Sequence, residues 1–161
     1  MLDSVMDALR SEFLDVSDVA EATRIVVRLL LAALLGALIG FNRERYGKAA
    51  GLRTHMLVAM GSAAFVVAPL VAGMQIGDLS RVIQGVIAGI GFLGAGTIIK
   101  HSGDEKIVGL TTAASIWMTS AIGVACGLGR DSTAIILAVL CWLVLGLADG
   151  LSNLGKRKAS S

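Results

Sequence analysis

Charged residues are scarce in this 161-residue chain, and their scarcity excludes most kinds of soluble protein. Only 16% of the residues are charged, against about 25% in a typical soluble domain. The formal net charge is +2, which gives no global attraction to nucleic acid. The two cysteines, Cys126 and Cys141, both lie inside apolar runs. They form neither a disulfide framework nor a metal-binding pattern, and we interpret them as small core residues.

Five apolar segments of 17 to 20 residues account for most of the chain: 25–41, 56–74, 82–99, 108–127 and 132–148. They contain a single charged residue, Arg28. Each has the length that a helix needs to cross a bilayer, and none shows the polar face of a soluble helix. The sequence therefore predicts an all-α polytopic membrane bundle of about five transmembrane helices at residues 25–149, with the lipid bilayer as its first partner.

The two ends of the chain differ in charge. Residues 1–24 combine apolar positions at helical spacing with acidic residues, which predicts a short amphipathic helix on the outer membrane surface. The connections after the first and third segments, together with the basic tail at 150–161, carry nine Lys and Arg, against four on the other side. The positive-inside rule then predicts an outer N-terminus and a cytoplasmic C-terminus.

Residues 89–94 read GIGFLG, which matches the G-x-G-x-x-G pattern of a dinucleotide-binding turn. No acidic residue follows at the distance that ribose binding needs, and the pattern lies inside an apolar segment. The alternative is a small-residue surface for close helix packing, or a helix break that exposes backbone to a cavity. The candidate residues for helix packing or for lining a path are Gly36, Gly40, Gly85, Gly89, Gly91, Gly94, Gly96, Thr97, Thr112, Ser115 and Thr119.

The hydroxyls of Thr112, Ser115 and Thr119 share one helix face by their spacing. They either line a polar path or, more commonly, bond to helix carbonyls and neighbouring helices. The five segments hold no Asp, Glu, His or Lys, which disfavours a cation route. His55 and His101 fall at loop edges, and no nucleophile set accompanies them. We therefore expect neither an enzyme nor a bound cofactor.

The loop at 41–55 is the most polar part of the chain. Arg53 begins an apolar segment, where the helix dipole disfavours a cation, so a carboxylate partner is predicted for it. Acidic residues on the same side of the membrane are the candidates. The predicted inner-loop cluster consists of Arg43, Glu44, Arg53, Thr54, Asp104 and Glu105.

The ordered motifs GLRTH, GIGFLGAGTI and GLTTAASIW resemble the transmembrane domain of the MgtC/SapB family, over about residues 30–147. Two departures are visible. Asn42 stands where members often have Glu, and the C-terminal ACT-like domain of many members is absent from the printed chain. The matching positions are Gly36, Gly40, Arg43, Glu44, Gly51, Arg53, Thr54, Gly89, Gly91, Phe92, Gly94, Gly96, Thr97, Gly109, Leu110, Thr111, Ala113, Ala114 and Trp117.

The resemblance implies a multi-pass protein of the bacterial inner membrane, linked to magnesium limitation, ion homeostasis and virulence. It implies regulation of other membrane proteins, with a P-type Mg²⁺ ATPase and the F-type ATP synthase as associated partners. Two hypotheses follow. The first is a non-enzymatic regulator that acts through helix contact with a partner, and the small-residue faces separately predict a homodimer. The second is a transporter or channel for an ion, such as Mg²⁺, or for a small solute.

Overall fold

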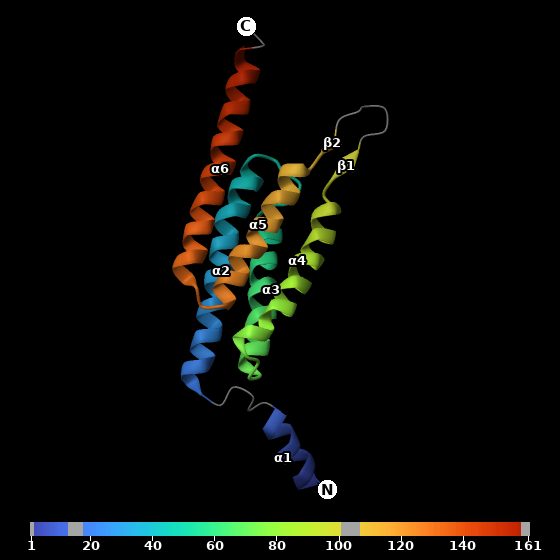
Figure 1. The fold of residues 1–161 in the computed structure, drawn as a ribbon, viewed down its shortest axis with the longest axis vertical. Coiled ribbons are helices and arrows are strands. Elements are labelled where there is room, and N and C mark those ends of the chain that lie inside the picture. Colours follow the sequence, from blue (N-terminus) through green and yellow to red (C-terminus); the bar gives the residue numbers. More distant parts are fainter. Residues whose placement is uncertain (1, 13–17, 101–106, 159–161) are drawn as a thin grey trace.

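The computed structural model describes residues 2–12, 18–100 and 107–158. The chain folds into an all-α bundle, as predicted (Figure 1). A single 3₁₀ turn, η1 (Ile76–Asp78), precedes α4, and a small hairpin of β1 (Ile99–Lys100) and β2 (Ile107–Val108) joins α4 to α5. The helices are α1 (Leu2–Glu12), α2 (Val19–Arg45), α3 (Leu52–Val71), α4 (Leu79–Ala95), α5 (Leu110–Gly127) and α6 (Asp131–Lys158).

Four helical stretches are long and apolar enough to cross a membrane: Val19–Arg45, Leu52–Val71, Ile76–Ala95 and Leu110–Gly127. α6 adds a shorter apolar stretch, Asp131–Leu147, so the described helices agree with the prediction of about five spans. The predicted amphipathic helix is α1, whose apolar side chains Leu2, Val5, Met6 and Leu9 are exposed. α6 continues to Lys158, so the basic tail is helical up to that residue.

The bundle has two distinct ends. The α2–α3 turn, the β1–β2 hairpin and the C-terminal end of α6 lie together at one end, at the top of Figure 1. We call this the hairpin end. α2 begins at the opposite end, where the α3–α4 and α5–α6 connections also lie. The basic residues of the α2–α3 turn therefore share an end with the basic C-terminal residues of α6.

Glycines on α2 and α5 let both helices approach α3 closely. A Cβ atom added at Gly36 of α2 would lie 2.5 Å from the carbonyl oxygen of His55. One added at Gly127 of α5 would lie 2.7 Å from the carbonyl oxygen of Ala63. One added at Gly123 would collide with the carbonyl of Ala59. Close van der Waals contact of this kind holds helices together in lipid, where the hydrophobic effect is weak.

The third apolar segment ends earlier than predicted. We expected a helix through residue 99, but α4 ends at Ala95, and Ile99 and Lys100 pair with Val108 and Ile107 in an antiparallel hairpin. The hydroxyl of Thr97 donates to the carbonyl of Gly94 at 2.7 Å, which satisfies a carbonyl of the last turn. Five of the six residues at positions 94–99 are glycine or β-branched, and both types disfavour helix continuation.

Candidate functional site

A buried polar layer joins the first turn of α3 to α5. His55 is fully buried, and its Nε2 lies 3.2 Å from Oγ of Ser115. Its Nδ1 lies 2.9 Å from the carbonyl oxygen of Gly51. The prediction that His55 sits at a loop edge is wrong, because α3 begins at Leu52 and carries the histidine one turn into the helix. A glycine N-cap at position 51 was the signal that could have placed it there.

The partners of His55 define which nitrogen carries hydrogen. The carbonyl of Gly51 can only accept, so Nδ1 must donate to it. In the neutral ring, Nε2 then accepts from the hydroxyl of Ser115. That hydroxyl also lies 2.8 Å from the carbonyl oxygen of Thr112, so its single proton is shared between two acceptors. His55 is thus bonded on both nitrogens inside the helix interface.

Other hydroxyls of this layer are buried, and that of Thr119 is bonded within the bundle. Thr112, Ser115 and Thr119 are all buried, and Thr119 donates to the carbonyl of Ser115 at 2.8 Å. One layer further along, Ser62 of α3 and Ser120 of α5 lie 2.8 Å apart, Oγ to Oγ. The Ser62–Ser120 contact joins α3 to α5, whereas the Thr119 bond lies within α5.

The inner-loop residues occupy different environments. Arg43, in the last turn of α2, is 1% exposed, whereas Arg53 is exposed and Thr54 is half-buried. Asp104 and Glu105 lie outside the described residues. The structure therefore does not gather the predicted cluster into one site within the part of the chain that it describes.

Glu44 bonds to the backbone of α3 and not to Arg53. Its Oε2 accepts from the N–H of Leu52 at 2.8 Å, which satisfies a donor that Gly51, lacking a side chain, cannot cap. A Cβ atom added at Gly51 would lie 2.7 Å from the same Oε2. Arg53 makes no ion pair with any described residue. Of the three carboxylates considered as partners for Arg53, Glu44 instead bonds to the start of α3, and Asp104 and Glu105 lie outside the described residues.

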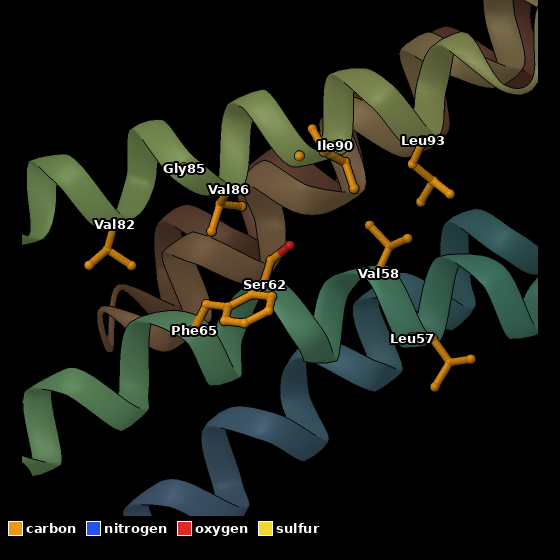
Figure 2. Close-up of a pocket in the computed structure, with 10 residues that line it drawn as sticks. Leu57, Val58, Ser62, Phe65, Val82, Gly85, Val86, Ile90 and Leu93 are labelled. Atoms are coloured by element: carbon orange, nitrogen blue, oxygen red, sulfur yellow. The ribbon is translucent and has the colours of Figure 1, made fainter.

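An apolar groove of about 580 Å³ lies between α3 and α4. Figure 2 shows Val86 and Ile90 of α4 facing Val58, Ser62 and Phe65 of α3. Gly85 and Gly89 also line it, and a Cβ atom added at either would meet nothing within 4 Å. At these two positions the α4 wall of the groove therefore has no side chain, and there is room for one.

The glycines of the third segment differ in their surroundings. A Cβ atom at Gly94 would lie 3.6 Å from Cβ of Ala113 on α5, an ordinary packing contact. One at Gly91 would meet nothing, and one at Gly96 would meet its own helix, 3.3 Å from the carbonyl oxygen of Leu93. Close helix packing inside the chain is thus found at Gly36, Gly40 and Gly94, and not at Gly85, Gly89 or Gly91. Packing of a second chain or another partner against Gly85, Gly89 and Gly91 stays a prediction.

Comparison with known sequences identifies the family. The sequence model of the MgtC family matches residues 29–154. The chain belongs to this family. Among its MgtC-family relatives, SrpB of Synechococcus elongatus is 54% identical over 120 residues, covering 68% of this chain and 66% of the relative. YhiD of Escherichia coli, whose name proposes a magnesium transporter, is 44% identical over 127 residues, covering 74% of this chain and 58% of the relative.

MgtC of Salmonella typhimurium is 40% identical over 122 residues, covering 74% of this chain and 51% of the relative. The chain thus spans from about half to two thirds of the length of these curated relatives. No solved structure matches it. The matched region includes α2 from Leu29 onwards and α3, α4 and α5 entirely, so the polar layer and the groove both lie within the family domain.

Proposed function

We propose that this MgtC-family chain is a non-enzymatic membrane protein that regulates other inner-membrane proteins through helix contacts. The observation that carries the proposal is the closed polar layer. His55, Ser115 and Thr119 are buried and bonded to groups of the bundle itself. Such a layer fixes helices in place and does not offer its polar groups to a passing ion.

The surface available for a partner helix is the outer face of α4. Ala88, Gly91 and Ala95 are exposed there, and Phe92 is 85% exposed. The three small residues lie at helical spacing on the side of α4 that faces away from the groove, whereas Phe92 lies between that side and the lining residue Gly85. Small residues let another helix approach closely, and an aromatic side chain adds contact area. A helix of a regulated protein, or of a second copy, fits this face.

The resemblance to MgtC/SapB proteins supplies the biological setting of the proposal: magnesium limitation, ion homeostasis and virulence in bacteria. Its candidate partners are a P-type Mg²⁺ ATPase and the F-type ATP synthase. The proposed orientation places the hairpin end in the cytoplasm, with the N-terminus outside. The basic residues Arg43, Arg45, Lys48 and Arg53 all lie in or beside the α2–α3 turn at that end, as the positive-inside rule requires.

Transport is the alternative function. The name of YhiD proposes a magnesium transporter, and the α3–α4 groove is an open feature between two spans. Its lining is almost entirely apolar, whereas a dehydrated Mg²⁺ ion needs oxygen ligands. The groove therefore supports the regulator better than a magnesium route.

Two measurements test the proposal. The first is Mg²⁺ flux in sealed liposomes that contain only the purified chain, where we expect no rate above empty liposomes. The second is co-purification in mild detergent, probed for the P-type ATPase and the ATP synthase. We expect Gly91→Leu to reduce co-purification and Gly146→Leu to leave it unchanged, because both positions have open space at Cβ but only Gly91 lies on α4. Mg²⁺ flux by the chain alone would overturn the regulator proposal.

A further inference from the structure

Gln84 is a polar residue on the outer face of α4, inside a membrane span. Its side chain is exposed and makes no hydrogen bond with any residue that the structure describes. The next two residues, Gly85 and Val86, line the groove together with Ser62 and Phe65 of α3 (Figure 2). The amide of Gln84 therefore lies level with the apolar part of α3 and not with either end of it.

The bilayer offers no hydrogen bond to an amide at this depth. Gln84 lies near the middle of the spanning stretch Ile76–Ala95, roughly 12 Å from its start, and the hydrocarbon layer is about 30 Å thick. Arg81, one turn nearer the outer end, is long enough to reach the membrane surface, but the shorter amide is not. An unpaired amide in hydrocarbon is unfavourable. A protein group at the same depth must therefore supply its hydrogen bonds.

Gln84 is in line with the small residues of the outer face. Gln84, Ala88, Gly91 and Ala95 are all exposed, at spacings of four, three and four residues. This is the spacing of the contact line between two helices that cross at a small angle. A Cβ atom at Gly91 would meet nothing within 4 Å, so a second backbone can approach closely there. We call these four residues the α4 seam.

The occupant that matches this seam is a second copy of the chain. Copies that insert in the same orientation place Gln84 at the same depth, and a two-fold axis along the membrane normal brings each seam against its own copy. Gln84 then meets Gln84. A carboxamide both donates and accepts, so two of them bond reciprocally, much as a buried Asn fixes the register of a coiled coil. A helix of another protein would need a polar group of its own at this depth.

We propose that two copies of the chain associate along the α4 seam, with reciprocal hydrogen bonds between their Gln84 side chains inside the bilayer. The inference rests on the proposed function in one respect, because it names the partner for the face that the proposed function assigns to helix contacts. A regulated protein that uses the same face must then compete with the second copy.

Sedimentation equilibrium of the purified full chain in density-matched detergent micelles measures this association. We expect a reversible dimer. Gln84→Leu should weaken it about tenfold, the effect of losing a reciprocal pair of hydrogen bonds between membrane helices. The substitution replaces a lipid-facing amide with an apolar side chain, so the fold of the single chain should be kept.

The packing of the seam is tested by filling it. Gly91→Leu should weaken the dimer at least about tenfold, because the new side chain holds the two helices apart. Gly89→Leu is the matched control, since its Cβ position on the same helix is also open but belongs to the groove. It should leave the dimer unchanged. Should Gly91→Leu lose the monodisperse peak in size-exclusion chromatography, Gly91→Val gives the same comparison with a smaller side chain.

Three results would overturn the proposal. One is a purified chain that stays monomeric at every concentration. Another is a dimer that Gln84→Leu and Gly91→Leu leave intact, which would place the interface elsewhere. The third is a dimer that Gly89→Leu weakens as strongly as Gly91→Leu, which would move the interface to the groove.

The same variants separate this inference from the proposed function. A monomeric chain whose co-purification with the ATPase or the ATP synthase falls in Gly91→Leu would overturn the dimer and leave the regulator proposal standing. A dimer that Gln84→Leu weakens, in a chain that co-purifies with neither protein, would support the seam and remove the regulated partner.

Discussion

Nε2 of His55 lies 3.2 Å from Oγ of Ser115, although the two residues are 60 positions apart in the chain. The contact joins the first turn of α3 to the second turn of α5, and His55 makes a second bond back to Gly51. A buried histidine bonded on both nitrogens fixes the position of two helices at once. The contact therefore gives the hairpin end of α3 a defined place against α5.

Replacing this histidine should destabilise the bundle. His55→Ala leaves the hydroxyl of Ser115 with one acceptor fewer and opens space in a fully buried position, so we expect a loss of about 1–3 kcal/mol. Thermal unfolding in detergent, followed by size-exclusion chromatography, measures it. A double-mutant cycle of His55→Ala and Ser115→Ala should show a coupling energy of about 0.6 kcal/mol, the mean for hydrogen bonds between membrane helices. Strict additivity would show that the contact contributes nothing.

The glycine contacts of α5 give a second prediction. A Cβ atom at Gly123 collides with the carbonyl of Ala59, so Gly123→Ala must push α5 away from α3. We expect a loss of about 1–3 kcal/mol, typical of overpacking, seen as a lower unfolding temperature. Gly61→Ala is the matched control, because a Cβ atom at Gly61 meets nothing within 4 Å. Equal behaviour of the two variants would contradict the close approach of α5.

A third prediction concerns Arg28, the single charge of the apolar segments. Its Nη1 donates to the carbonyl oxygen of Gly127 at 3.0 Å, so the cation lies at the C-terminus of α5, where the helix dipole favours positive charge. Arg28→Met should cost about 1–2 kcal/mol of stability. Arg24→Met, an exposed residue one turn earlier in α2, should cost much less. A similar loss of stability in Arg28→Met and Arg24→Met would show that Arg28 acts by anchoring α2 at the bilayer surface and not by its bond to the C-terminus of α5.

The cap on α3 gives a fourth prediction. Glu44→Ala removes the acceptor for the N–H of Leu52, and we expect a loss of about 1 kcal/mol, as for other N-cap acceptors. Hydrogen exchange at Leu52 should accelerate while exchange in the middle of α3 stays slow. Glu44→Gln keeps an acceptor oxygen, so its stability and its exchange rate at Leu52 should lie between those of the unsubstituted chain and of Glu44→Ala. An unchanged exchange rate at Leu52 in Glu44→Ala would mean that the carboxylate does not cap the helix.

The sequence was sufficient to predict the helices but not their neighbours. Charge placement located the apolar segments because a membrane span excludes nearly all charged residues, and only Arg28 breaks the rule. Which glycines pack could not be predicted in the same way. Gly36 and Gly85 occur in similar apolar surroundings in the sequence, yet one contacts α3 and the other faces an open groove. A small-residue face looks the same in sequence whether it meets a helix or lipid.

The site depended on contacts that are distant in sequence or set by a short turn. His55 is buried because α3 begins at Leu52, and that start is stabilised by a carboxylate from the previous helix. The hairpin after α4 depends on pairing between residues 99–100 and 107–108, which hydropathy alone does not reveal. The family motifs marked GLRTH as important, but the physical role of its histidine came from the packing of α3 on α5.

The exposed face of α4 makes the chain convenient for chemical labelling. Both native cysteines, Cys126 and Cys141, are buried, so neither needs to be removed before a reactive thiol is added. Gly91→Cys places a thiol in open space on a helix that is barely covered by the rest of the chain. A maleimide dye, a nitroxide or a crosslinker at that position can identify the molecules that contact α4 in a native membrane. The substitution leaves the close contacts of the α2 and α5 glycines with α3 unchanged.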